Sequence, residues 1–151
     1  MLREFRPSDI RAMVALFRRS VHETAAAHYE PEQLAAWAPN SSSPRWVRRL
    51  PNDAVFVYEL DNQITGFVAV ESSGHVDLLY VDPEYQRRGI ATKLFDRVRV
   101  WAEASGLARM STEASVTVRP FFERCGFTVV REQIVQPDGV AMRNFWMELL
   151  L

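Results

Sequence analysis

The stretch DLLYVDPEYQRRGIATKLFDRVRVWAE, residues 77–103, decides the fold. It begins as an apolar strand and ends as an amphipathic helix whose apolar stripe holds Ile90, Leu94, Val98 and Trp101. Two arginines and a glycine stand between them, where the helix begins. The free N–H groups of a first helical turn already carry partial positive charge, so cations are not the usual residues there. Because cations at such an end make sense if an anion is held, the stretch predicts an anion site at the start of a helix.

The chain before this stretch predicts a strand, a helix and a broken helical region. Residues 2–5 alternate apolar and polar side chains, as a short strand does. Ser8 is expected to cap a helix with one buried face. Residues 22–50 hold short helical pieces broken by prolines, one of them Pro39.

From residue 54 the pattern changes to strands, and it predicts an α/β fold. The strand–helix–strand unit over residues 75–113 should be a right-handed parallel crossover in a mixed, mostly antiparallel sheet with flanking helices. The other elements expected are strands over 54–60 and 64–71, a short helix over 116–125 and a hairpin over 127–150.

Length and composition indicate one domain over residues 1–151, and the pattern at Met1 together with the lack of a long apolar run predicts a cytosolic protein. A net charge of −1 argues against bulk electrostatic attraction to nucleic acid or a membrane, so we expect neither as a partner. Met1 leads straight into a polar segment, and no run of about 18 apolar residues is present. Cys125 stands alone, which excludes an intrachain disulfide and a cysteine-built metal site, and we expect no metal.

Two motifs resemble those of the GNAT superfamily of N-acetyltransferases. The chain lacks both the mononucleotide and the dinucleotide glycine patterns. Gln86-Arg87-Arg88-Gly89-Ile90-Ala91 instead resembles the acetyl-CoA motif Gln/Arg-x-x-Gly-x-Gly/Ala, and residues 120–127, PFFERCGF, resemble the family's Phe-Tyr-Glu-x-x-Gly-Phe. The motifs lie about 35 residues apart in the family's element order. The competing interpretation of Arg87 and Arg88 is a solvated turn with surface arginines.

The resemblance implies a GNAT-like fold with two splayed parallel strands and acetyl-CoA as cosubstrate. The pantetheine arm would lie between those strands, along the first of them, and the loop backbone would hold the pyrophosphate, with Phe122 packed against the thioester. The residues expected to bind the cosubstrate are Leu79, Tyr80, Val81, Gln86, Arg87, Arg88, Gly89, Ile90, Ala91, Thr92 and Phe122.

In this family a primary amine attacks the thioester directly, in a ternary complex, so a base and a thiolate proton donor are useful. Many members carry a tyrosine donor where this chain has Phe122, and a phenyl ring cannot donate a proton. Asp77 is the first candidate base, through a relay water, and Glu113 is the alternative across the cleft. Asp77 could also be a strand-end aspartate that faces solvent or pairs with an arginine, and Cys125 is expected to be structural.

The acceptor pocket is expected from residues 22–39, which resemble a largely uncharacterised bacterial GNAT branch with His-Tyr-x-x-Glu-Gln-Leu-x-x-Trp at this place. His22, Tyr29 and Trp37 are the candidate substrate contacts, and Trp46 could join an aromatic wall for a small amine. The aromatic residues could equally be the core of a helical cap.

Three functions remain open from the sequence. The first is acetyl transfer to a primary amine of a small molecule, peptide or protein. The second is a catalytically weak acyl-CoA sensor or scaffold, favoured by Phe122. The third is a toxin-like acetyltransferase of aminoacyl-tRNA, for which only Arg45, Arg48 and Arg49 hint at a basic face. A homodimer is also left open.

Overall fold

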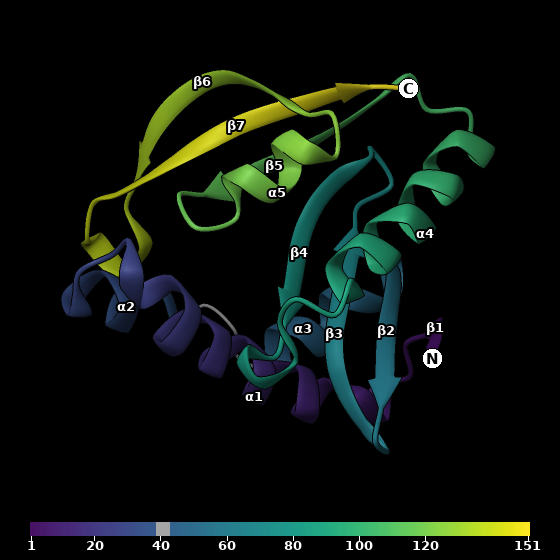
Figure 1. The fold of residues 1–151 in the computed structure, drawn as a ribbon, viewed down its shortest axis with the longest axis horizontal. Helices are drawn as coiled ribbons and strands as arrows, with labels where there is room; N and C mark the ends of the chain where they lie inside the picture. The colour runs from purple at the N-terminus through teal and green to yellow at the C-terminus, as the bar shows by residue number, and fades with distance from the viewer. Residues whose placement is uncertain (39–42) are drawn as a thin grey trace.

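The computed structural model describes residues 1–38 and 43–151, so the break expected at Pro39 lies outside the described residues. Seven strands form one sheet in the order β1-β2-β3-β4-β5-β7-β6 (Figure 1). The strands are β1 (Leu2–Glu4), β2 (Ala54–Leu60), β3 (Gln63–Val70), β4 (His75–Val81), β5 (Arg109–Ser115), β6 (Thr128–Val135) and β7 (Met142–Leu150). The α-helices are α1 (Ile10–Arg19), α2 (Pro31–Trp37), α3 (Ser43–Arg49), α4 (Ile90–Ala104) and α5 (Arg119–Arg124).

The sheet is mixed and mostly antiparallel, as predicted. Within the described residues, β4 and β5 form the parallel pair, and α4 makes the crossover between them. The expected Ser8 cap is wrong: a 3-10 turn, Pro7–Asp9, precedes α1, and Asp9 is the N-cap residue. The Asp9 carboxylate is used elsewhere, since it accepts the Arg6 N–H at 2.7 Å and binds Arg3 at 2.9 Å.

Helices cover the two faces of the sheet (Figure 1). Phe56 and Val68 point toward α4, whereas Val57 and Phe67 belong to the core beneath α1 and α3. At Gly66 of β3 an added Cβ would lie 2.8 Å from a methyl carbon of Ile90, so only a residue without a side chain lets α4 lie this close. This close approach fixes the start of α4 over the sheet.

The two parallel strands separate almost as soon as they meet. Their register contains only the pairs His75–Ser111 and Val76–Thr112. Beyond Val76 the strands diverge, and β6 and β7 curve away from β2, β3 and β4 (Figure 1). The backbone of β4 from Leu78 onward is therefore paired with β3 but not with β5.

A β-bulge lies at the point of separation. Ala69 pairs with Leu78 and Val70 pairs with Val76, so Asp77 is the extra residue of β4. Bulges re-aim a side chain and bend the strand that carries them. Asp77 is thereby placed on the same side as α3, where it meets Arg49.

Candidate active site

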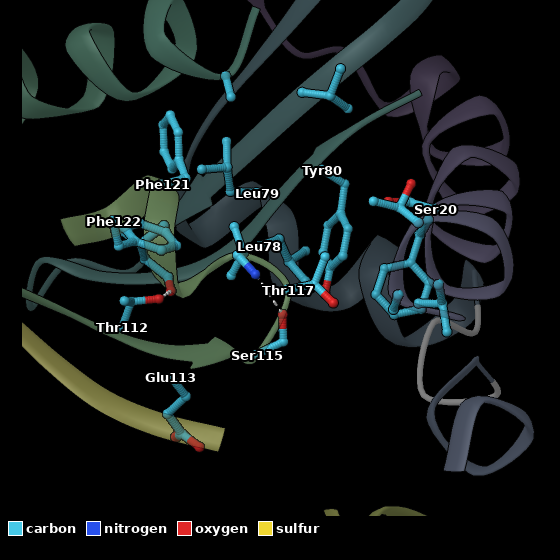
Figure 2. Close-up of a pocket in the computed structure, with 18 of the residues that line it drawn as sticks. Ser20, Leu78, Leu79, Tyr80, Thr112, Glu113, Ser115, Thr117, Phe121 and Phe122 are labelled. Atoms are coloured by element: carbon cyan, nitrogen blue, oxygen red, sulfur yellow. Dashed lines mark hydrogen bonds between the residues drawn. The ribbon is translucent and has the colours of Figure 1, made fainter. Parts of the chain in front are cut away.

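A cleft of about 890 Å³ opens where β4 and β5 diverge. Figure 2 shows Leu79 and Tyr80 of β4 opposite Thr112 and Phe122, with Ser20 beyond Tyr80. The predicted site residues that line this cleft are Asp77, Glu113, Leu79, Tyr80, Val81, Gln86, Arg87, Gly89, Ile90, Ala91, Thr92, Phe122, Tyr29 and Trp37. Two predicted residues, Arg88 and His22, do not line it.

The loop before α4 presents unused backbone donors to the cleft. Lys93 is the first residue of the helix whose N–H bonds back to the loop, to the Gly89 carbonyl at 3.1 Å. The first-turn N–H groups before it have no carbonyl of their own helix to bind. Gly89 has a φ of 75°, and a Cβ there would meet no atom within 4 Å. The space in front of these donors is open, and its partial positive charge suits a phosphate.

Asp82 anchors this loop, although the sequence reasoning did not select it. Its carboxylate binds Arg19 Nη2 at 2.6 Å and accepts the Glu84 N–H at 3.0 Å. Its own N–H bonds to the Thr65 carbonyl at 2.8 Å. An aspartate directly before Pro83 is a typical start signal for a helical turn, so the sequence did hold a clue.

The two loop arginines point in different directions. Arg87 has a φ of 63° and lines the cleft. The Arg88 guanidinium lies 4.8 Å from the centre of the Tyr85 ring, a cation–π contact, and Arg88 does not line the cleft although Tyr85 does. The Arg88 side chain is therefore not placed to bind the cosubstrate, and a contact through its backbone N–H stays a prediction.

Arg124 is a further cleft cation that sequence reasoning missed. It lines the main cleft and, with Thr92 and Phe121, an adjoining cavity of about 230 Å³ between α4 and α5. Arg124 forms no ion pair with any residue that the structure describes. Its only sequence signal was its place inside the second motif, two residues before Gly126.

Phe122 packs in an aromatic cluster at the wall of the cleft. It is 2% exposed, and ring centres of Phe95, Phe121 and Phe127 lie 6.4, 5.5 and 5.1 Å from its own. Nearby, burial raises the pKa of the Cys125 thiol to about 11, and Asp96 adds to the rise. The thiol is therefore protonated at neutral pH and is a poor nucleophile.

The candidate bases lie in different surroundings. Asp77 forms an ion pair with Arg49 inside the cleft. Glu113 is exposed, accepts a hydrogen bond from Gln133 Nε2 at 3.1 Å, and points away from the other labelled side chains in Figure 2. Asp77 is thus the more enclosed of the two carboxylates.

The histidines lie away from the cleft or at its margin. His22 is exposed on the π-helical segment Ser20–Thr24. The His28 ring nitrogen lies 3.0 Å from Thr117 Oγ1, and His75 stacks on Trp146 with 5.1 Å between ring centres. The expected substrate contact by His22 is not supported by this placement.

The aromatic residues expected to form a wall for the acceptor amine pack largely in the hydrophobic core. The Tyr29 hydroxyl donates to the Arg143 carbonyl and accepts the Val116 N–H, both at 2.8 Å, so it joins the helical region to β7 and to the residue that follows β5. Trp46 is buried against Phe17 and Phe67. Trp37 packs edge-on against Tyr29, with 5.7 Å between ring centres.

Tyr80 brings a buried phenol to the cleft. Its ring packs edge-on against Phe17, with 4.7 Å between ring centres. Burial raises the pKa of the Tyr80 hydroxyl, the nearby Asp77 adds to the rise, and a hydrogen bond with the Trp37 side chain opposes it. The hydroxyl is therefore protonated at neutral pH.

A sheet that splits between two parallel strands, with the start of a helix beside the split, is the arrangement that the resemblance to the GNAT superfamily implied. The acetyltransferase (GNAT) domain profile matches residues 25–149, and the chain belongs to this family of N-acetyltransferases. The family, the fold class and the enzyme class predicted from the two motifs are confirmed.

Individual relatives agree with this assignment. The chain is 37% identical over 146 residues to the uncharacterized N-acetyltransferase YafP of Escherichia coli K12, covering 97% of this chain and 93% of that protein. A GCN5-related N-acetyltransferase structure from Rhodopseudomonas palustris superimposes with a TM-score of 0.96 at 28% identity, covering 100% and 95% of the two chains. PaiA N-acetyltransferase from Thermoplasma acidophilum, solved with coenzyme A, shares the fold with a TM-score of 0.81 at 19% identity, covering 100% and 98%.

In the part of the chain that the structure describes, no group of three or more histidine, cysteine, aspartate or glutamate side chains is placed to hold a metal ion. No helix among residues 1–38 and 43–151 is long and apolar enough to cross a membrane.

Proposed function

We propose that the protein transfers the acetyl group of acetyl-CoA directly to a primary amine of a small molecule or peptide. One observation carries this proposal: the start of α4, with its first-turn N–H groups, and the backbone of β4 that is not paired with β5 open into the same cleft. An elongated cosubstrate with phosphates at one end and amide groups along its arm has complementary features.

The residues of the cleft fit such a molecule. The phosphates would lie against the backbone N–H groups of residues 87–92, with Arg87 and Arg124 supplying charge-assisted donors. The amide-bearing arm would extend along Leu79, Tyr80 and Val81, whose backbone on this side has no strand partner. Phe122 would then contact the acyl end of the arm.

Asp77 is the proposed acceptor of the amine proton, directly or through water. As the C–N bond forms and the C–S bond breaks, the thiolate leaves with the bonding electron pair and the amine loses its proton to the carboxylate. The bulge places Asp77 in the cleft at the point where the strands separate. Glu113, which lines the cleft from β5, is the alternative base.

A second function, binding of acyl-CoA without turnover, is favoured by Phe122, because that side chain cannot protonate the thiolate. Modification of aminoacyl-tRNA has less support, since the Arg49 guanidinium is engaged by carboxylates and is not free for a phosphate backbone. The cytoplasmic location, the bacterial source and a homodimer stay predictions.

The test is a panel of amines, polyamines, aminoglycosides and peptides with acetyl-CoA, read by release of free thiol. Asp77→Asn should lower turnover by about 10²–10³ while leaving the affinity for acetyl-CoA unchanged. Glu113→Gln, which alters the other carboxylate, should retain activity. Binding of acetyl-CoA without thiol release for any amine would favour the sensor function, and loss of activity only in Glu113→Gln would move the base to β5.

A further inference from the structure

Arg49 lies among three carboxylates beside the cleft. Its guanidinium forms an ion pair with Asp77 and approaches Glu71 at 3.4 Å and Asp53 at 3.9 Å. Arg49 is the last residue of α3, and Asp77 is the bulge residue of β4. Asp53 directly follows the Leu50–Asn52 turn, and Glu71 directly follows β3. Arg49 and Asp77 line the cleft, whereas Asp53 and Glu71 stand behind them.

Asp53 is the most buried of the three carboxylates. Its side chain is 9% exposed, and its Oδ2 atom is buried without a hydrogen-bond donor among the described residues. Burial raises the pKa of Asp53 to about 6; Arg49 opposes this rise, and Glu71 and Asp77 add to it. The single positive charge of Arg49 therefore faces three carboxylates, whose combined negative charge exceeds it.

This sharing matters for a base that is held by an arginine. An arginine bound to one carboxylate alone orients it but strongly favours its charged form, which makes it a weaker base. Glu71, whose Oε1 lies 3.4 Å from Arg49 Nη2, competes for the donors of the guanidinium, and Asp53, whose Oδ2 lies 3.9 Å from Nε, competes for its charge. The cluster can thus orient Asp77 without giving it an exclusive cationic partner.

We propose that Arg49 is a positioning residue for Asp77, and that Asp53 and Glu71 hold its guanidinium in a shared position that leaves Asp77 able to accept a proton. This inference rests on the proposed role of Asp77 as the base. It assigns a catalytic contribution to two carboxylates that do not line the cleft. Protonation of Asp53 as the pH falls through about 6 releases its hold on Arg49, and activity declines.

The experiment measures kcat and KM against pH for four variants, with an amine found in the panel. Arg49→Met should lower kcat by about tenfold or more with little change in the KM for acetyl-CoA. Arg49→Lys, which keeps the charge but not the planar fork, should restore part of the loss. Asp53→Asn should lower kcat near pH 8 and abolish the inflection near pH 6. Arg48→Met is the matched control, because Arg48 neighbours Arg49 on α3 but lies outside the cleft, and its profile should equal the wild type.

The outcomes separate this inference from the proposed function. Unchanged kcat and an unchanged pH profile in Arg49→Met and Asp53→Asn, with activity lost in Asp77→Asn, would overturn the inference alone. Full activity in Asp77→Asn would overturn the role of Asp77 as the base, and the inference about Arg49 with it. A panel in which no amine is acetylated would overturn both as well. If Arg49→Met does not fold, Arg49→Lys and Asp53→Asn still decide, since each retains the size of the side chain.

Discussion

The Asp82 carboxylate binds Arg19 Nη2 at 2.6 Å, so the end of α1 is tied to the loop that follows β4. The two residues are 63 positions apart in the chain. The same carboxylate caps the turn Pro83–Tyr85 and thereby sets the path of the backbone toward Gly89. The end of α1 thus helps to order the loop proposed to hold the phosphates.

Arg19→Ala should therefore weaken acetyl-CoA although Arg19 is not proposed to touch it. Without the ion pair to Asp82, the loop becomes ordered only when the ligand binds. This ordering costs about 1 kcal/mol of binding free energy, or about fivefold in affinity. Isothermal titration calorimetry measures this change. Arg18→Ala, at the exposed neighbouring position, is the control. Equal affinities of the two variants would show that the Asp82 contact does not order the loop.

Gly89 and Gly106 provide a matched pair for testing the loop. Both have positive φ, 75° and 77°, and at both a Cβ would meet no atom within 4 Å. Glutamate at either position should cost a similar stability, about 1–2 kcal/mol, because the left-handed backbone disfavours a side chain. Only Gly89→Glu should abolish acetyl-CoA binding, because it places negative charge before the phosphates. Retained binding in a folded Gly89→Glu protein would refute the site.

The two loop arginines should differ in their effect on binding. Arg87→Ala removes a cleft cation and should cost about 1.5–3 kcal/mol, at least tenfold in affinity for CoA. Arg88→Ala loses only the contact with Tyr85 and should bind almost normally. Titration of both variants with CoA decides this, and the opposite ranking would place the phosphates on the other side of the loop.

Asp53→Asn should stabilise the protein at neutral and alkaline pH. The folded pKa of Asp53, about 6, lies above its ordinary value, so ionisation opposes folding and stability from this group is lost as the pH rises toward 6. Asparagine removes that penalty, by about 1–2 kcal/mol after allowing for solvent screening. Urea unfolding at pH 8 should show the gain, and at pH 4 the two proteins should be nearly equal. A gain that persists at pH 4 would have another cause.

Cys125 should prove dispensable for acetyl transfer. Its raised pKa of about 11 means that alkylation by iodoacetamide is slow at pH 7.5 and accelerates as the pH approaches 11. Cys125→Ala should keep full turnover, since no covalent intermediate is proposed. Loss of turnover in a correctly folded Cys125→Ala protein would contradict direct transfer.

Local sequence was sufficient for the parts of the site that are contiguous in the chain. An apolar run and helical periodicity predicted β4 and α4, and the glycine between them predicted where a ligand would approach. The direction of Arg88 was not predictable in the same way. It depends on the positive φ of Arg87, a local handedness that composition does not reveal.

The contacts that the sequence did not reveal join distant positions. The ion pair of Asp77 with Arg49 depends on a one-residue bulge, which changes the direction of a strand side chain without leaving a signature in the strand pattern. The Tyr29 hydroxyl is held by positions 116 and 143, which only the completed sheet brings together. Aromatic spacing alone could not distinguish this role in the core from a wall for the acceptor.

The separation of β4 from β5 also interrupts the cooperativity of the sheet. The ladder between β4 and β5 contains two residue pairs, and it joins the four strands β1, β2, β3 and β4 to the three strands β5, β7 and β6. This seam between the two halves is therefore the part of the sheet that opens most easily. Amide protons of β4 that face the seam should exchange with solvent sooner than those that bind β3. An arm lying in the gap would act as a missing strand and slow that exchange. The bound cosubstrate would then complete the hydrogen bonding between the two halves of the sheet, and the two halves would open as one cooperative unit.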